Sequence, residues 1–414
     1  MHLLKLGMLL CLCTACGHDY TDIASSESRD TAPSTADVPQ LTTDEASFAF
    51  DLYRAQIGSD SSSNVFFSPY SVSVALAMTF AGASGNTASQ IASAMHFTLP
   101  PERLHTAFDA IDLQLESREG IKLNVANSIW GQRTLAFGKP FLDTLAIDYG
   151  SEVRGVDFIG ATNQATAAID GWVADHTAGK IQNLFPPGSL DESTRVVLVN
   201  AVYFDANWKT QFDSSKTTSS PFTKLDGSTV TASMMNNEKL NANVAVAPTY
   251  TAVDLPYAGG QTSMLVIVPT GMQFASVDAA LGGDFLKQIV ASLRPQDIAL
   301  SLPKFTLKGA SVSLKSALRA LGMIDAFDPD KADLSAMVPN QRLNVDDVVH
   351  QAFVRVNESG TEAAAATGVD NQLTAIDQTL HVDASRPFFF VLRDIPTGAV
   401  LFVGRVMDPT LTTL

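Results

Sequence analysis

Several strand patterns in this sequence are apolar on both faces, and this feature constrains the fold more than any other. A strand of that kind is buried on both sides, so helices have to cover the sheet that contains it. Helical patterns lie between the strand patterns, but in an irregular order rather than a strict alternation. That order favours an α+β fold over a doubly wound parallel sheet. The strand patterns cover residues 121–130, 195–204, 264–268, 297–307, 348–356, 388–392 and 399–406.

Helical periodicity begins at Thr43, and Ser68 with Pro69 supplies the N-cap and first-turn proline of a second helix. Further helical patterns cover residues 103–115, 141–149, 162–177 and 312–321. Between Thr43 and Leu414 the sequence has no internal repeat and no linker. With 46% apolar and 17% charged residues among 414, the chain can bury one large core. We therefore expect a single large domain over residues 43–414.

All three cysteines, Cys11, Cys13 and Cys16, lie in the first sixteen residues. The rest of the chain therefore has no cysteine for a disulfide, a thiolate metal site or a nucleophile. Around these cysteines, Lys5 precedes an apolar run from Leu6 to Leu12, and small residues follow. This is the pattern of an export signal, and it is too short to span a bilayer as a mature helix.

Residues 13–17, CTACG, resemble a bacterial lipobox, in which signal cleavage leaves a lipidated cysteine as the new N-terminus. The resemblance implies a signal peptide over residues 1–15 and a lipid anchor on Cys16. Residues 16–42 are rich in Ser, Thr, Asp and Ala, so we expect a flexible tether. The protein would then be a cell-envelope lipoprotein, on the outer membrane or cell surface, that meets the membrane only through its lipid. Because Cys13 stands where a lipobox usually has leucine, a plain secretory signal and a secreted protein remain the alternative.

Charge and motifs exclude several classes of function. The chain has 27 Lys and Arg against 43 Asp and Glu, a formal charge of −16, which repels phosphate backbones, so we expect no nucleic-acid partner. The sequence contains no HExxH motif, no glycine-rich phosphate loop and no GxSxG elbow. Asp175 and His176 are adjacent at the end of a helical pattern, where side chains rarely face each other. We therefore expect no enzyme activity, no cofactor and no metal site.

A connection of about 25 residues between two strand patterns is unusually long for a compact domain, so it is either functional or disordered. Residues 357–367 read NESGTEAAAAT, and residues 368–383 contain no Lys, Arg, Pro or aromatic residue. In an extended chain Thr361, Ala363, Ala365 and Thr367 share one small, uncharged face, and Glu362 points the other way. That face could enter a sheet. Composition alone favours the other interpretation, an Ala-rich helical turn in a mobile loop.

The segment from Glu358 to Thr367 resembles the hinge of an inhibitory serpin, and other serpin-like motifs follow in order along the chain from about Thr43 to the C-terminus. We identify the chain as a member of the serpin family, with a lipoprotein-type signal of a bacterial member. The further motifs are NVFFSPYSVS (64–73), GASGNT (82–87), LNVANSIW (123–130), IDGWV (169–173) with GKI (179–181), VNAVYF (199–204) with Trp208, LPKF (302–305), RPFFF (386–390) and LFVGRV (401–406).

The resemblance implies a serpin fold in which an exposed loop is bait for a protease. Cleavage acylates the protease, and the hinge half of the loop inserts into the large sheet as a new strand. The hinge residues implied are Glu358, Gly360, Thr361, Glu362, Ala363, Ala364, Ala365, Ala366 and Thr367. Family spacing places the scissile bond between residues 373 and 377, and we assign it to Thr374–Ala375. Because no Lys or Arg lies between Arg355 and Arg386, we expect an elastase-like or subtilisin-like target rather than a trypsin-like one.

The resemblance also implies a buried polar gate beneath the point where the strands part, made of Ser68, Ser71, Asn200 and His350. Trp208 corresponds to the aromatic residue where the loop first enters the sheet. The implied partner is a serine protease, or a cysteine protease, and we expect a monomer. Residues 103–119 mix charges of both signs, so we expect no polyanionic cofactor. Two alternatives are a non-inhibitory serpin-fold surface protein and a lipid-anchored hydrolase.

Overall fold

The computed structural model describes residues 20–412 except for residues 59, 61, 310 and 362–378. Within these residues, the first sheet has eight strands in the order β1-β4-β3-β5-β14-β13-β11, with β12 paired to β13. Its strands are β1 (Thr21–Ile23), β3 (Ile121–Gln132), β4 (Val153–Val156), β5 (Val196–Asn207), β11 (Phe305–Lys308), β12 (Val312–Ser313), β13 (Val348–Asn357) and β14 (Gly360–Thr361).

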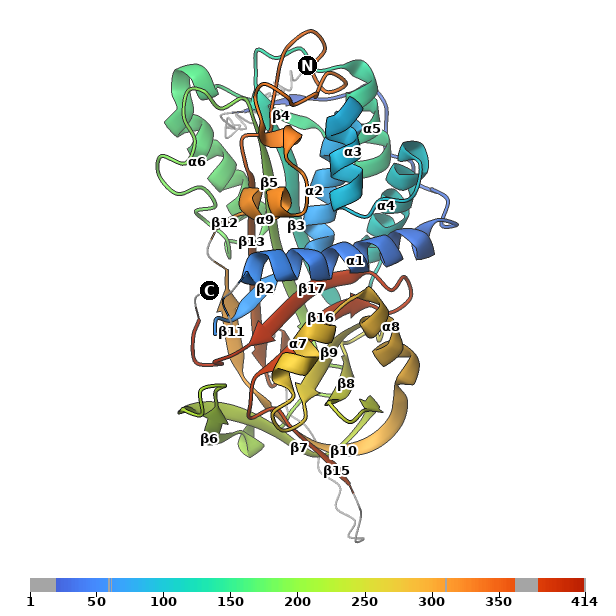
Figure 1. Ribbon diagram of the computed structural model, residues 1–414, viewed down its shortest axis with the longest axis vertical. Coiled ribbons are helices and arrows are strands. Elements are labelled where there is room, and N and C mark those ends of the chain that lie inside the picture. Colours follow the sequence, from blue (N-terminus) through green and yellow to red (C-terminus); the bar gives the residue numbers. More distant parts are fainter. Residues whose placement is uncertain (1–19, 59, 61, 310, 362–378, 413–414) are drawn as a thin grey trace, which may run out of the picture.

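The second sheet has nine strands among the described residues, in the order β15-β10-β7-β8-β9-β16-β17-β2, with β6 paired to β7. In Figure 1 most of the first sheet lies above α1 and most of the second sheet lies below it, while β11 of the first sheet reaches below α1. The strands are β2 (Val65–Phe67), β6 (Thr218–Thr223), β7 (Thr229–Val246), β8 (Tyr250–Pro256), β9 (Thr262–Pro269), β10 (Arg294–Pro303), β15 (Leu380–Asp383), β16 (Phe388–Asp394) and β17 (Val400–Val406).

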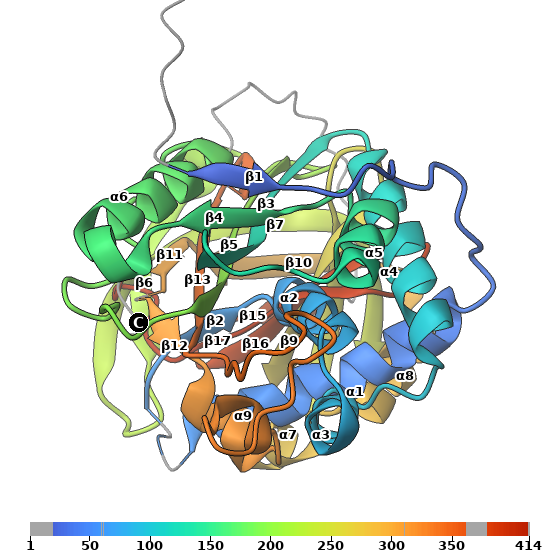
Figure 2. The same ribbon diagram turned by 90° about the horizontal axis from the view of Figure 1, so that it is seen from above.

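Helices cover both sheets, and α6 lies over the outer face of the first sheet (Figure 2). None of the helices in the described part of the chain is long and apolar enough to cross a membrane. The helices are α1 (Val38–Ile57), α2 (Pro69–Ala81), α3 (Gly85–Ala94), α4 (Pro101–Glu116), α5 (Lys139–Tyr149), α6 (Phe158–His176), α7 (Phe274–Ala280), α8 (Gly283–Ser292) and α9 (Lys315–Ala320), with single 3-10 turns at Ser214–Lys216 and Asp325–Phe327.

Burial of β5 on both faces confirms the expected α+β architecture. Leu198 and Val202 point into the main core. Val197 and Val199 point the other way, into a second core that contains Trp172 of α6. The alternation follows from the strand period of two, and both sets are apolar because neither face of β5 meets water.

One expected strand is two strands in the structure. Residues 297–307 read as a single apolar pattern, but β10 ends at Pro303 in the second sheet and β11 begins at Phe305 in the first. Between them, Lys304 donates its backbone N–H to the carbonyl of Ser233. The ladder with β7 therefore continues one residue beyond Pro303, and the chain changes sheets only after Lys304. An apolar pattern marks burial but does not show that the partner strand changes.

The structure corrects the expectation of a flexible tether for residues 20–42. β1 pairs antiparallel with β4, with Thr21 opposite Gly155 and Ile23 opposite Val153. Figure 2 shows β1 at the edge of the first sheet. α1 begins at Val38 instead of Thr43. A polar segment can dock in this way because the ladder uses backbone groups, which composition does not report.

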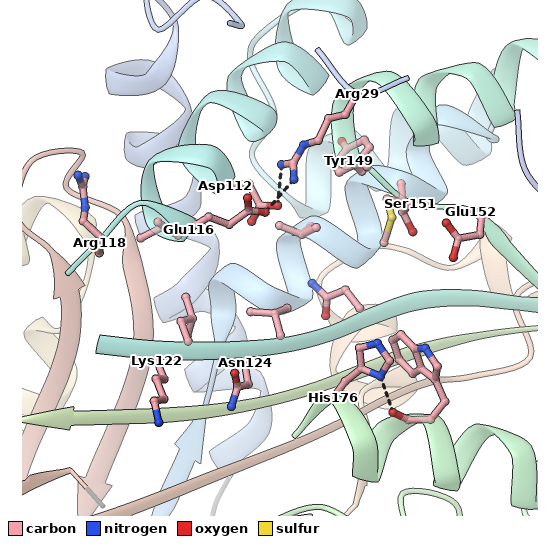
Figure 3. A pocket seen from close by; sticks show the side chains of 18 of the residues that line it. Arg29, Asp112, Glu116, Arg118, Lys122, Asn124, Tyr149, Ser151, Glu152 and His176 are labelled. Atoms are coloured by element: carbon pink, nitrogen blue, oxygen red, sulfur yellow. Dashed lines mark hydrogen bonds and ion pairs between the residues drawn. The ribbon is translucent and has the colours of Figure 1, made fainter. Parts of the chain in front are cut away.

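Arg29 provides a second attachment for this N-terminal segment. Its guanidinium lies 2.7 Å from a carboxylate oxygen of Asp109, 3.0 Å from one of Asp112 and 2.8 Å from one of Glu116. These acids are spaced so that one face of α4 carries all three. Figure 3 shows Arg29 directed at Asp112 and Glu116, and all three residues line the cavity beside β3. Arg29 is therefore the cation that compensates this acidic face.

Candidate functional site

The first sheet is forked between β5 and β13. The two strands pair directly and in parallel from Leu198 opposite Val348 to Tyr203 opposite Phe353. Beyond that stretch β14 lies between them and runs antiparallel to both. Thr361 pairs with Ala206 on one side and Val356 on the other. The segment that follows β13 therefore turns back and begins a strand inside the sheet.

Only glycine fits at the start of this short strand. A Cβ atom on Gly360 would lie 2.1 Å from the carbonyl oxygen of Ala206 and 2.6 Å from the Cα of Asn207. The backbone φ of Gly360 is +155°. Glycine is therefore required at position 360 mainly because the backbone of β5 lies so close to it.

Thr361 is fully buried in the fork. Its Oγ1 lies 2.7 Å from the hydroxyl of Tyr257. The ring of Tyr257 stacks on Trp208, with centroids 4.6 Å apart. Burial raises the pKa of Tyr257, so this phenol stays protonated. The sequence gives no sign of this role of Tyr257, because no motif or spacing connects it to the loop.

Trp208 holds the turn between β13 and β14. Its indole Nε1 donates to the carbonyl of Asn357 at 2.9 Å, and its backbone N–H donates to the carbonyl of Ser359 at 2.8 Å. The structure therefore places Trp208 where the loop segment enters the sheet.

Glu358 is fixed by two side chains of the second sheet and its connections. Lys304 lies 2.9 Å from one carboxylate oxygen, and the Thr217 hydroxyl donates to the other at 2.7 Å. Burial acts to raise the pKa of Glu358, but these two hydrogen bonds outweigh it and the pKa is lowered. The carboxylate is therefore ionised and anchors the start of the segment.

A buried polar cluster lies beneath the fork, where β5 and β13 still pair. It contains the four residues expected together, Ser68, Ser71, Asn200 and His350, and a fifth, Asn127 of β3. Asn200 Nδ2 donates to Ser71 Oγ and to Asn127 Oδ1, each at 2.6 Å. Asn127 Nδ2 donates to the carbonyl of Ser71 at 3.1 Å. Asn127 lies within the LNVANSIW motif, but a strand motif does not say which polar side chain joins a cluster.

The hydrogen bonds of His350 determine its tautomer. Nε2 accepts the backbone N–H of Ser68 at 3.1 Å, so the proton is on Nδ1, which donates to Asn200 Oδ1. Burial lowers the pKa of His350 to about 3. The neutral ring therefore links α2 to both central strands. Separating β5 from β13 would break the bond between His350 and Asn200.

The remaining expected site residues lie outside the described residues. These are Glu362, Ala363, Ala364, Ala365, Ala366, Thr367, Thr374, Ala375 and Cys16. Of the Asp175–His176 pair, His176 stacks on Trp172 and bonds its carbonyl through Nδ1. In the described part of the chain no group of three or more His, Cys, Asp or Glu residues is arranged to hold a metal ion.

Comparison with known proteins gives one family. The model of the family "Serpin (serine protease inhibitor)" matches residues 43–409. The leukocyte elastase inhibitor of Xenopus laevis is 36% identical over 373 residues, which cover 87% of this chain and 97% of that protein. The human leukocyte elastase inhibitor is 35% identical, with 89% of this chain and 100% of that protein covered.

Solved structures agree with this match. The native state of tengpin, a thermophilic serpin, superposes with a TM-score of 0.85 at 28% identity and covers 94% of this chain and 100% of its own. Uncleaved ovalbumin superposes with a TM-score of 0.80 at 25% identity, covering 89% of this chain and 100% of its own. Together with the forked sheet, these matches establish that the chain belongs to the serpin family.

Proposed function

We propose that this protein inhibits a serine protease as a suicide substrate. The target cleaves the loop that follows β14, and the acylated protease is trapped when that loop continues β14 through the first sheet. The observation that carries the proposal is the burial of Thr361 between β5 and β13 in the uncleaved chain. A loop that served only as a connection would not be expected to form the first residues of a central strand.

The register of β14 predicts where each hinge residue would go. Thr361 pairs with Ala206 and Val356, and β14 is antiparallel to both strands. Extending the same register places Thr367 opposite Asn200 and His350. Insertion would therefore carry the last hinge residue into the polar cluster, where its hydroxyl could replace the broken bond between those two side chains.

The side chains of the hinge residues fit insertion between β5 and β13 in this register. Cross-strand partners share a face, and Ala206, like Leu198 and Val202, lies in the main core. Residues 363, 365 and 367 would face that core too, where a charged side chain would be buried without a partner. The sequence has Ala, Ala and Thr at these positions.

Insertion would be favourable overall and slow to start. Each new ladder hydrogen bond contributes ~0.5–1.5 kcal/mol net, so a full strand rivals the ~5–15 kcal/mol stability of a typical domain. Before that gain, β5 and β13 have to separate and the polar cluster has to open. The intact form is therefore kinetically trapped.

We assign the scissile bond to Thr374–Ala375 and the target class to elastase-like or subtilisin-like proteases. The absence of Lys and Arg from residues 356–385 supports this choice, as does the similarity to leukocyte elastase inhibitors. We also propose that the chain is exported, with Cys16 as a lipid anchor or as part of a plain secretory signal, and acts as a monomer without a polyanionic cofactor.

The experiment compares wild type, Thr361→Arg and the control Thr361→Ser on denaturing gels after incubation with elastase or subtilisin. We expect a covalent complex from wild type and from Thr361→Ser. Thr361→Arg should be cleaved without forming a complex, because a guanidinium in the fork would be buried without a partner. If wild type is cleaved by every protease and never forms a complex, the non-inhibitory surface protein is the better description. Undiminished trapping by Thr361→Arg would refute the role given to β14.

A further inference from the structure

The first sheet has a free edge along part of β3. Residues 121–131 of this strand pair with β5 on one side, but only residues 129–132 pair with β4 on the other. Among the described residues, no strand lies beside residues 121–128 on the side away from β5. β3 therefore has one paired edge and, over most of its length, one unpaired edge.

The hydrogen bonds at the end of β3 show which backbone groups point to the unpaired edge. Gln132 donates its backbone N–H to the carbonyl of Arg195, on the β5 side, at 2.8 Å. Arg133 donates to the carbonyl of Val156, on the β4 side, also at 2.8 Å. The β3–β5 register has no shift, and the groups of successive residues point to alternate edges of a strand. The odd-numbered residues of β3 therefore direct their N–H and C=O groups away from β5.

Three of these odd-numbered residues, Leu123, Val125 and Asn127, lie on the unpaired edge. In the part of the chain that the structure describes, their backbone groups have no hydrogen-bond partner on that side. All three residues are half-buried, so the edge is not closed to an incoming group. A row of unpaired backbone groups on a strand edge is a template for a further strand.

A cavity of about 530 Å³ runs along this edge. Its lining includes the consecutive residues 121–125 of β3. Because neighbouring side chains of a strand point to opposite faces of the sheet, one cavity can contact all of them only from the edge. The opposite wall comes from the end of α4, from the chain just before β4 and from the end of α6. The cavity is therefore a groove beside the unpaired edge.

The two sides of the groove differ in polarity. On the side of α2 and α4 the wall includes Val74, Met78 and Leu115, which belong to the main core. On the other side of β3 the wall includes Asn124 and His176 (Figure 3). Every second side chain of a strand in the groove would therefore meet an apolar wall, and the others would meet a polar one.

The charged groups around the groove are already compensated within the protein. Lys122 lies opposite Asp205 in the ladder between β3 and β5. The three arginines of the lining have carboxylate partners, so the groove favours an uncharged occupant. The partners are Asp394 for Arg118 at 2.8 Å, Glu152 for Arg154 at 2.6 Å, and the acidic face of α4 for Arg29.

We propose that the free edge of β3 binds an extended, uncharged peptide segment of about five residues, apolar at every second position, as an additional strand. The edge from residue 121 to residue 127 spans ~20 Å at ~3.4 Å per residue, which accommodates such a segment. Strand addition of this kind takes affinity from backbone hydrogen bonds and specificity from alternate side chains. The proposal does not depend on protease inhibition.

Antiparallel pairing, the more stable form, fixes which atoms of the peptide bind. A peptide residue opposite Val125 would exchange both backbone hydrogen bonds with it and share its face of the sheet. The apolar residues of the peptide would therefore direct their N–H groups at β3. The polar residues between them would direct their N–H groups away.

The binding test uses fluorescence anisotropy on the intact protein. The probe is the end-blocked peptide Val-Thr-Val-Thr-Val with a neutral fluorophore, and we expect it to bind. N-methylation of the central valine removes an N–H aimed at β3 and should lower the affinity at least tenfold. N-methylation of the preceding threonine should change it less than twofold. Equal losses, or no binding of the unmodified peptide, would overturn the proposal, and the reverse order would overturn the antiparallel arrangement.

Variants of the protein locate the peptide. Val125→Pro removes an N–H from the free edge but no bond to β5, and proline is tolerated at such positions. It should abolish binding, whereas the matched control Val125→Ala keeps the N–H and should retain binding. Ser151→Trp narrows the groove without changing β3 and should also weaken binding, so the site can be tested even if Val125→Pro does not fold.

Two results would assign the peptide or the edge differently. Thr361→Arg alters the fork and should leave peptide binding unchanged. Binding lost in Thr361→Arg but kept in Val125→Pro and Ser151→Trp would place the peptide in the fork and overturn the proposal. Sedimentation of the protein alone tests a second copy of the chain as the occupant. A dimer that Val125→Pro converts to a monomer would replace the peptide by that second copy.

Discussion

At the scale of single residues, protonation of His350 would disrupt the polar cluster, because a charged imidazole can no longer accept the backbone N–H of Ser68. The imidazole has a pKa of about 3 in the folded chain against ~6.5 in an unfolded one. Above pH 6.5 the ring is neutral in both states and pH has no effect through this residue. As pH falls from 6.5 towards 3, only the unfolded chain takes up the proton, so the folded state loses up to ~1.4 kcal/mol per pH unit. His105, whose pKa burial lowers to about 4, acts in the same direction.

We therefore predict a lower melting temperature at pH 5.5 than at pH 7.5, and His350→Gln should reduce that difference. The variant will be less stable at pH 7.5 because it loses the bonds to Ser68 and Asn200. Its melting temperature should nevertheless fall less on acidification than that of wild type. His105→Gln is the matched control for the other buried histidine. An identical pH dependence in wild type and His350→Gln would mean that His350 is not buried in its neutral form.

Arg29 offers a second residue-scale test, of the docked N-terminal segment. Asp109 is fully buried, and burial raises the pKa of Asp109 and of Asp112. Arg29→Gln would leave these acids without their cation, and we expect a loss of about 1–3 kcal/mol. The control is Arg103→Gln, which removes an exposed pair with Asp37 and should change stability little. Equal melting temperatures for the two variants would contradict the docking of this segment and favour a flexible tether.

At the scale of elements, β14 is the strand that loop insertion would extend, so its position in the sheet should affect protease trapping. Gly360→Ala should displace this strand, because the added methyl carbon would meet the backbone of Ala206 and Asn207. Trp208, which bonds Asn357 and packs on Tyr257, should then change its fluorescence. Trapping of elastase should also fall, since the inserted strand would carry the same clash. Ser359→Ala is the neighbouring control, and a Gly360→Ala variant with unchanged fluorescence and trapping would contradict this geometry.

Individual elements also show how much of the fold could be predicted from the sequence. Residues 388–392 and 399–406 are continuous apolar runs, and the structure has β16 and β17 there. β7 extends over 18 residues, but it mixes Asn, Ser and Thr with apolar residues and so gives no comparable pattern. Ser68, Ser71, Asn200 and His350 were expected together through a family resemblance. The roles of Tyr257 and Asn127 could not be predicted, because they depend on side-chain positions that only the packed sheets define.

At the scale of the whole molecule, metastability separates an inhibitor from a protein that merely shares the fold. Cutting the loop near Thr374 with a protease that is not trapped should let the hinge complete β14. The cleaved protein should then melt well above the intact one, because the new strand satisfies backbone groups and buries small side chains. Melting curves of intact and cleaved protein provide the measurement. Curves that superimpose would refute the inhibitory mechanism, since an ordinary nicked loop adds no stability.

The docked N-terminal segment determines how the molecule would stand on a membrane. The N-terminal end of the described chain and β15, which follows the loop, lie at opposite ends of the long axis (Figure 1). If Cys16 carries a lipid, four residue steps, roughly 14 Å of fully extended chain, separate it from Tyr20. The end of the molecule that carries β15 would then face outward, and extending β14 past Asn200 would carry a captured protease towards the lipid. A 200-residue protease has a radius of gyration of roughly 16 Å and does not fit in that gap, so an anchored molecule has to lean over as it traps its target.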